Sequence, residues 1–392
     1  MDLKTEFQNE LINNILPYWT NKMQDNENGG FYGRIDGNDF IHKDANKGAI
    51  LNTRILWTFS AAYRIFKQPS YLEIANRAFN YINDFFIDSM WGGVFWELDA
   101  TGNPINRKKQ LYAQAFALFS YSEYYLATGD EKALEQAKEI FSLLDQCCDR
   151  NLDGYFEAFS DKWSYIEDMR LSNKDANERK TMNTHLHIME SFTNLYRAWK
   201  DERVKNALER IINIFTDRIL DKKTNHLNLF FDKNWNLKSS TISFGHDIES
   251  AWLLYEAAEV LGNEELINSI KDVTLKIVDA TLEGLDDKGG MIYEIIDGVE
   301  DRDCHWWVQA EAVVGLMFAW KISGNITYRE KALKNWEFIK RYIIDYENGD
   351  WFWSSLPDGK PNKKDDKAGF WKCCYHNARM CMEMMKLIEL PI

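Results

Sequence analysis

The apolar positions of this chain form long helical stretches, separated by short segments rich in glycine and aromatic residues. Six stretches are apolar over most of their circumference, and they begin near Leu51, Leu111, Thr184, His246, Trp306 and Tyr375. A helix of that kind is buried on both sides. Between them lie amphipathic stretches, such as 70–86, 132–148 and 265–282. Their single charged face predicts helices that are half exposed.

The short segments recur at a spacing of about sixty to seventy residues, the range of structural repeats. They begin at Gly29, Trp91, Asp153, His226, Gly289 and Asn348. Glycine beside alternating aromatic residues indicates a tight turn with a short strand or hairpin. The predicted unit is therefore a hairpin, a buried helix and a half-exposed helix, repeated six times.

Six such units predict an all-α fold, an (α/α)6 barrel with short β-hairpins at one end. An open α-solenoid is the alternative arrangement, but it needs polar capping repeats, and the sequence shows none. No linker rich in proline, glycine or serine divides the chain. We therefore expect residues 1–392 to form one catalytic domain.

The composition limits which partners the protein is expected to bind and in which cellular compartment it is expected to occur. The net charge of −14 disfavours nucleic acid and anionic membranes, and no apolar run is long enough to span a bilayer. Leu3, Phe7, Leu11 and Leu16 form a helical stripe rather than a signal peptide. The six cysteines match neither a disulfide framework nor a zinc site, which favours a cytoplasmic protein. The 15 Trp and 18 Tyr suit a small-molecule sugar partner, and no pattern fixes an oligomeric state.

Residues capable of chemistry collect where the six buried helices begin. Five of the seven histidines lie at such starts. The full set is Arg54, Tyr112, Asn183, His185, His187, His246, Asp247, Glu249, His305, Trp306, Trp307, Glu311, His376 and Arg379. In a closed barrel these starts converge at one end around the axis. Histidines scattered through a core would not share one phase of a repeat, so the pattern predicts a site there.

Helical geometry sorts the members of this set. Successive residues turn by about 100°, so His185 and His187 diverge. We expect His187 to face the cavity and His185 to lie on the apolar stripe. His246 and Glu249 share a face, so Glu249 is expected to orient His246, unless it is simply a solvated first-turn glutamate. Trp307 either walls the sugar site or packs against a neighbouring helix.

Two histidines near one centre predict a proton transfer at carbon. A helix start disfavours imidazolium, and a nearby carboxylate opposes that effect, which predicts pKa values near the operating pH. One base can remove the proton next to a carbonyl, and the other can return it to the opposite face, which inverts the carbon. His246 and His376 fit as the bases, with Arg54 and His187 as electrophilic partners. Such a reaction requires no metal and no nicotinamide cofactor.

Five motifs, RILWTF, MNTHLHIME, SFGHDIESAW, HWWVQAEA and FWKCCYHNAR, resemble those of cellobiose 2-epimerases in the N-acylglucosamine 2-epimerase superfamily. The resemblance spans nearly the whole chain. It implies an (α/α)6 barrel and cofactor-independent 2-epimerisation of a reducing-end glucose unit to mannose. It assigns His246 and His376 as the acid/base pair, Arg54 to the enediolate and His187 to ring opening. It places Tyr112, Asn183, Glu249, Trp307, Trp371 and Asp175 at the sugar.

The last motif departs from the family pattern, because Cys374 and Ala378 stand where proline and glycine are usual. Both flank the last histidine, so they bear on substrate preference. Several other functions stay open from the sequence. They are epimerisation or aldose–ketose isomerisation of free hexoses, sugar binding without catalysis, glycoside hydrolysis by Asp175, Asp247, Glu249 or Glu311, and a zinc site from His187, His246, His376 and Glu249.

Overall fold

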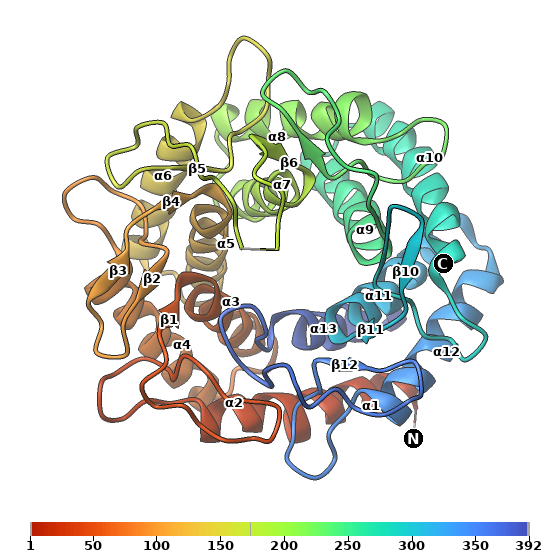
Figure 1. Ribbon diagram of the computed structural model, residues 1–392, viewed down its shortest axis with the longest axis horizontal. Coiled ribbons are helices and arrows are strands. Elements are labelled where there is room, and N and C mark those ends of the chain that lie inside the picture. Colours follow the sequence, from red (N-terminus) through yellow and green to blue (C-terminus); the bar gives the residue numbers. More distant parts are fainter. Residues whose placement is uncertain (1, 173, 390–392) are drawn as a thin grey trace.

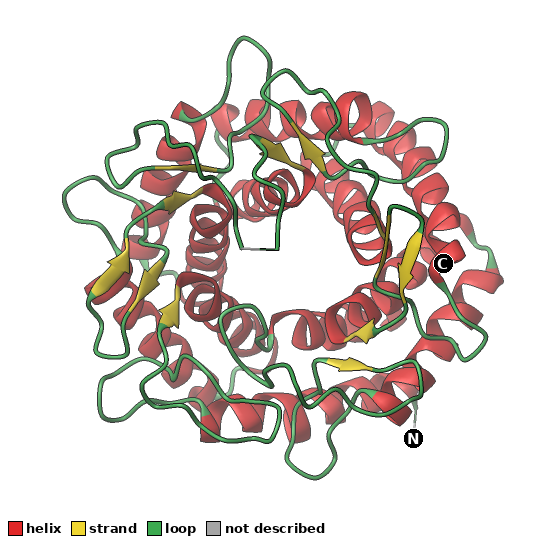
Figure 2. Ribbon diagram, in the orientation of Figure 1, coloured by secondary structure: helices red, strands yellow, loops and turns green. Residues whose placement is uncertain are grey.

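The protein forms two concentric rings of helices in a computed structural model that describes residues 2–172 and 174–389 (Figures 1 and 2). The inner ring consists of α3 (Ala49–Phe66), α5 (Leu111–Thr128), α7 (Met182–Ala198), α9 (Phe244–Leu261), α11 (Trp306–Ser323) and α13 (Tyr375–Glu389). Each packs on the next in chain order, and α13 packs on α3. The ring is closed, which confirms the (α/α)6 barrel and rejects the open solenoid.

The outer ring consists of the more amphipathic helices. They are α4 (Pro69–Tyr81), α6 (Glu131–Gln146), α8 (Glu202–Ile214), α10 (Glu264–Thr281) and α12 (Ile326–Tyr342), with α1 (Leu3–Glu10) and α2 (Leu16–Lys22) at the N-terminus. Three π-helical turns and one 3-10 turn extend them: η1 (Leu11–Ile15), η2 (Ile82–Phe86), η3 (Phe215–Ile219) and η4 (Leu282–Gly284). Helix α1 packs on α13, so the N-terminal segment completes the outer ring beside the last inner helix. No helix within the described residues is long and apolar enough to cross a membrane.

Short strands at one end of the barrel join neighbouring units. They are β1 (Lys47–Gly48), β2 (Glu97–Leu98), β3 (Pro104–Asn106), β4 (Lys109–Gln110), β5 (Ala158–Phe159), β6 (Lys180–Thr181), β7 (Phe230–Phe231), β8 (Ile242–Ser243), β9 (Glu294–Ile296), β10 (Val299–Asp301), β11 (Cys304–His305) and β12 (Ser354–Ser355). The strand that enters an inner helix pairs antiparallel with a strand of the following unit, as β1 does with β2 and β4 with β5. This pairing fixes where each inner helix starts relative to its neighbour.

The first turn of an inner helix is also tied to the next unit through the backbone. The amide of Leu111 donates to the carbonyl of Glu157 at 2.9 Å, and the amide of Met182 donates to the carbonyl of Leu229 at 2.9 Å. These amides belong to the first turn, where no carbonyl of the same helix can accept from them. The neighbouring unit therefore provides hydrogen-bond acceptors for the helix starts at which the sequence places the candidate functional residues.

Buried ion pairs anchor three of these starts. The lysine two residues before the helix reaches the aspartate that begins the preceding turn, with Nζ–Oδ2 distances of 2.8, 2.7 and 3.1 Å in Lys47–Asp25, Lys109–Asp88 and Lys180–Asp149. The same ammonium donates to a carbonyl of that turn, that of Gly92 in the case of Lys109. The three lysine side chains are at most 1% exposed, so each pair is effectively out of water.

Replacing Lys109 by methionine leaves Asp88 buried without its cation. We expect a loss of about 3–5 kcal/mol in unfolding free energy, since an uncompensated buried charge is costly. Urea denaturation measures it. The matched control is Lys43→Met, because Lys43 pairs with Glu27 where both side chains are at least 60% exposed. That variant should lose less than about 1 kcal/mol, and equal losses in the two variants would refute the proposed role of burial.

Candidate active site

Equivalent positions of the inner helices meet around the barrel axis. The fifth residue after the first residue of α3, α5, α7, α9 and α11 is Arg54, Phe116, His187, Glu249 and Glu311, respectively. The guanidinium of Arg54 lies 4.2 Å from the ring centroid of Phe116, which is 4.6 Å from that of His187. Glu249 and Glu311 both contact Arg379 of α13. The shared phase seen in the sequence therefore brings these side chains into one cluster.

Arg379 holds three glutamates from three inner helices. Its Nη2 donates to Oε1 of Glu249 and to Oε1 of Glu311, each at 2.6 Å. Its Nη1 donates to Glu190, which also accepts from the hydroxyl of Tyr375. All four charged side chains are buried. Burial alone would raise the pKa of these carboxyls, and Arg379 opposes that shift.

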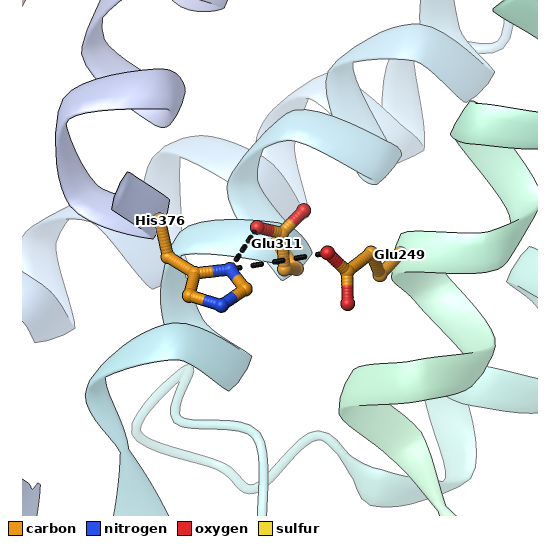
Figure 3. Close-up of side chains that lie close together, drawn as sticks. All are labelled: Glu249, Glu311 and His376. Atoms are coloured by element: carbon orange, nitrogen blue, oxygen red, sulfur yellow. Dashed lines mark hydrogen bonds and ion pairs between the residues drawn. The ribbon is translucent and has the colours of Figure 1, made fainter. Parts of the chain in front are cut away.

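His376 lies beside two of these glutamates (Figure 3). Its Nδ1 is 2.7 Å from Oε1 of Glu311 and 3.9 Å from Oε1 of Glu249. Burial lowers the pKa of His376 to about 3 although Glu311 acts in the opposite direction, and the cations Arg54 and Arg379 lower it further. The imidazole is therefore neutral at ordinary pH.

His246 has a different partner from the one the sequence predicts. Its Nδ1 is 2.9 Å from Oγ of Ser243, one turn back, whereas Glu249 is committed to Arg379. The expectation that Glu249 orients His246 is wrong. The two side chains share a helix face, but the carboxylate of Glu249 binds the guanidinium of Arg379 on α13, which attracts it more strongly than a neutral imidazole does. Burial lowers the pKa of His246 to about 3. The expected pKa values near operating pH are therefore wrong for both histidines.

One indole lies against both imidazoles. The ring centroid of Trp307 is 4.8 Å from that of His246 and 5.7 Å from that of His376. The two histidines therefore lie at the same end of the barrel, each close to one aromatic ring. Trp307 and His246 are also partly exposed, so this part of the cluster opens to solvent. Trp307 packs on α9 at Gly245 and His246 and also lies near His376, so both sequence interpretations of this residue stay open.

The other predicted catalytic residues lie close to this pair. Nδ1 of His187 is 2.9 Å from Oε2 of Glu190, and the imidazole meets the ring of Tyr112 edge-on at 4.9 Å. Arg54 donates to the hydroxyl of Tyr112 at 2.8 Å and to the carbonyl of Trp371 at 3.2 Å. Burial lowers the pKa of His187, and Glu190 opposes this effect.

Among the residues that the family resemblance assigns to catalysis or to the sugar, two buried polar atoms have no hydrogen-bond partner within the described part of the chain. They are Nε of Arg54 and Oδ1 of Asn183. Buried polar atoms are normally paired, so a donor and an acceptor left free at a cluster of charged groups suit a polar ligand. A sugar offers both hydroxyl donors and oxygen acceptors.

Two candidates from the sequence lie outside the cluster. His185 is a structural residue on the apolar stripe, as predicted, because its two ring nitrogens bind the carbonyl of Thr181 and the amide of Tyr155. Asp247 is bound by His226 and the amide of Leu227. That occupation removes Asp247 from the carboxylates available to a hydrolase.

Two further candidates lie above the helix starts. Asp175 accepts from the amide and the hydroxyl of Ser172, at 2.8 and 2.7 Å, within the loop between β5 and β6. This loop projects over the middle of the ring in Figure 1. The imidazole of His305 stacks on Tyr293 at 3.9 Å between ring centroids. The partners found for both residues therefore lie outside the buried cluster around Arg379.

The described residues contain one group whose side chains are close enough to hold a metal, and it differs from the zinc set that the sequence suggested. It comprises Glu249, Glu311 and His376, with ligand atoms within 4.8 Å of one another. His187 and His246 do not belong to it. The guanidinium of Arg379 already donates to both carboxylates, so a cation of the protein itself supplies the positive charge that a metal ion would supply to them.

Sequence reasoning missed several residues of the site. Glu190, Ser243 and Tyr375 each contact a predicted catalytic residue or its partner. The i, i+3 spacing of His187 and Glu190, and of Ser243 and His246, was a detectable signal. The contacts of Tyr375 with Glu190 depend on helices far apart in the sequence, and no local pattern reports them.

Glu157 was also missed, and it supports the start of α7. It is buried, and its Oε1 accepts from the amide and hydroxyl of Thr181, the N-cap of α7, at 3.0 and 2.7 Å. Its Oε2 accepts from the hydroxyl of Thr184 at 2.7 Å. Burial raises the pKa of Glu157 to about 7 although these donors oppose it.

Comparison with known proteins places the chain in a family. The sequence profile of the N-acylglucosamine 2-epimerase (GlcNAc 2-epimerase) family matches residues 30–379. The chain is 53% identical to the cellobiose 2-epimerase of Bacteroides fragilis over 386 residues, 98% of each protein. It therefore belongs to the N-acylglucosamine 2-epimerase family, and it is an isomerase of the carbohydrate epimerase type.

Solved structures give the same result. The structure of a sugar epimerase from a ruminal bacterium superposes with a TM-score of 0.96 at 38% identity and covers 100% of both chains. Cellobiose 2-epimerase from Bacillus thermoamylovorans gives a TM-score of 0.94 at 38% identity, with 98% of each chain covered. The barrel and the order of its helices are thus those of known epimerases.

The raised pKa of Glu157 makes stability depend on pH. The folded protein retains the carboxyl proton up to about pH 7, whereas the unfolded chain releases it near pH 4.5, the ordinary pKa of a glutamate. The contribution of Glu157 is therefore present below pH 4.5 and is lost as pH rises through 7. Relative to Glu157→Gln, the native sequence should lose about 3 kcal/mol of unfolding free energy between pH 4.5 and 8. Urea midpoints at several pH values measure this difference, and parallel curves would contradict the assignment.

Proposed function

We propose that this protein is a cofactor-independent 2-epimerase that interconverts reducing-end glucose and mannose units of β-1,4-linked disaccharides of the cellobiose type. The observation that carries the proposal is the placement of His246 and His376 against one indole, beside a free donor of Arg54. The 53% identity to a cellobiose 2-epimerase supports the choice of substrate.

In the proposed reaction, one imidazole removes the C2 proton of the open-chain aldehyde. The electron pair of the C–H bond forms the C1–C2 double bond, and O1 gains the negative charge of an enediolate. The other imidazole returns a proton to the opposite face of C2, and the carbonyl at C1 forms again. Inversion requires the two bases to flank the same carbon, and the proximity of both imidazoles to Trp307 supports their placement at one site.

Arg54 and His187 are the proposed electrophilic partners. Arg54 is buried and its Nε is unpaired, so it suits the developing oxyanion better than a solvated cation would. His187 is proposed to assist ring opening at the anomeric centre. Tyr112, Asn183, Glu249, Trp307, Trp371 and Asp175 are the proposed sugar-contacting residues.

The neutral state of the two imidazoles suits the base in this reaction. A histidine whose pKa is lowered by burial is unprotonated and ready to accept a proton. The resulting imidazolium lies beside the enediolate, and their attraction in a buried site offsets the cost of the new charge. The neutral state does not explain which group supplies the proton that returns to C2.

The experiment is incubation with cellobiose in D2O, followed by NMR of the products. The proposal expects glucosyl-mannose that carries deuterium at C2. Free glucose would instead indicate a glycoside hydrolase, a ketose would indicate an aldose–ketose isomerase, and no exchange would indicate a binding protein. Free glucose and mannose, tested in parallel, show whether the second sugar unit is required.

Replacing either His246 or His376 by alanine should reduce epimerisation by about 10²–10⁴-fold, the usual contribution of a general acid or base. The measurement is the initial rate of C2 inversion by NMR, with circular dichroism to verify the fold. The control is His42→Ala, because His42 pairs with Asp36 on a surface turn outside the cluster. A near-normal rate in either test variant would remove that residue from the mechanism.

A further inference from the structure

Inversion by two bases needs one of them to supply a proton, and the structure leaves both imidazoles neutral. Burial lowers the pKa of both His246 and His376 to about 3. A histidine with so low a pKa is a poor reservoir for the proton that must reach the opposite face of C2. Another group near one of the imidazoles has to hold it.

Three carboxylates surround Arg379, and they outnumber the permanently positive side chains near enough to neutralise them. Glu190, Glu249 and Glu311 all bind this single guanidinium, and all are buried. Two of them, Glu249 and Glu311, accept from the same nitrogen of Arg379. Like charges so close in a dry environment do not all ionise, so the pair Glu249/Glu311 is expected to share one proton.

This pair adjoins the inner nitrogen of His376. Figure 3 shows both carboxylates directed toward Nδ1 of the imidazole, with Oε1 of Glu311 at 2.7 Å and Oε1 of Glu249 at 3.9 Å. His246, by contrast, has the hydroxyl of Ser243 at the same ring position. Only one of the two proposed bases therefore has a carboxyl pair behind it.

We propose that Glu249 and Glu311 store one proton and that His376 relays it, so that His376 serves as acid and as base while its imidazole stays neutral. The proposal rests on the proposed 2-epimerase function. In the acid form, the pair is protonated, Nδ1 of His376 accepts from it, and Nε2 carries a hydrogen. In the base form, the pair is ionised, Nδ1 carries the hydrogen and Nε2 is bare.

The proton balance closes over one turnover. His246 takes the C2 proton of one epimer, and the C–H electron pair forms the enediolate. Nε2 of His376 then gives its proton to the opposite face of C2, while Nδ1 takes the stored proton across the contact with Glu311. His246 ends protonated and the pair ends ionised. Transfer of the proton from His246 to the pair through solvent restores the starting state, and the other epimer follows the same steps in reverse.

Burial and Glu311 raise the pKa of Glu249 to about 8, whereas Arg379 and His376 hold the pKa of Glu311 well below its usual range, so the stored proton rests on Glu249 and passes to His376 through Glu311. The stored proton is therefore present below pH 8 and is lost as pH rises through that value. The charged and titratable groups that act on the pair come from inner helices all round the barrel; they are Arg54, Tyr112, Glu190, His246, Tyr375, His376 and Arg379.

The test is Glu249→Gln, which keeps the size of the side chain and removes its exchangeable acid proton. In D2O, NMR counts two events for each epimer, namely exchange of the C2 hydrogen and inversion of C2. For the epimer whose C2–H faces His246, we expect inversion to fall about 10²-fold more than exchange, whatever equal loss the altered sugar contact adds to both. The ratio of exchange to inversion should rise by about the same factor, and the decline of inversion above pH 8 should disappear.

Glu190→Gln is the matched control, because Glu190 binds the same guanidinium but backs His187 instead of His376. It should slow the reaction without changing the ratio of exchange to inversion or the alkaline decline. A second measurement needs no active variant. Infrared difference spectra of the native protein should show a protonated carboxyl that titrates near pH 8 and is absent from Glu249→Gln.

The outcomes separate the two proposals. Absence of C2 exchange in the native protein with every disaccharide and hexose tested would overturn the proposed function. Native epimerisation together with an unchanged ratio in Glu249→Gln would overturn the proton store alone. The same holds if no protonated carboxyl is found below pH 8, or if Glu190→Gln changes the ratio as much as Glu249→Gln.

Discussion

The burial of Arg379 among three glutamates constrains the whole centre of this barrel. A guanidinium out of water needs acceptors on both of its terminal nitrogens, and those acceptors come from α7, α9 and α11, while the arginine comes from α13. Four of six inner helices must therefore hold their register together. The histidines gain their positions from the same network, because His187 and His376 each bind one of these glutamates.

This constraint explains why the two proposed bases differ. His376 belongs to the charged network, whereas His246 has only the hydroxyl of Ser243 behind it. A symmetric pair of bases would be expected if the six units were equal, since His246 and His376 occupy similar places at their helix starts. The chain instead surrounds equivalent positions with different partners, and the division of chemical roles follows from those partners.

Much of the architecture could be predicted from the sequence, because the repeat is encoded in local patterns. Buried helices, half-exposed helices and turn segments each have their own apolar period, and six copies make the closed ring the consistent arrangement. The position of the candidate site was expected from the gathering of Arg54, His187, His246 and His376 near the starts of inner helices. Local patterns predict well on which face of a helix a residue lies.

The partners of these residues were harder to predict. Glu249 shares a face with His246, yet it binds an arginine 130 residues later in the chain. The ordinary pKa values expected for the histidines failed for the same reason, since burial and distant cations decide them. Glu157 gave no signal at all, because it acts through Thr181 and Thr184 of the next inner helix. Contacts between units, rather than within them, escape single-sequence reasoning.

The packing of α1 on α13 has a consequence for the connectivity of the ring. Lys4 and Glu389 form an ion pair, so the two described ends of the chain lie side by side. A short peptide joining them would leave every inner helix in place, and the covalent break could be moved to an exposed hairpin tip such as that between β9 and β10. The central cluster thus requires the cyclic order of the units, and it does not depend on which unit is translated first. Circular permutation therefore offers a route to rearranged versions of this enzyme.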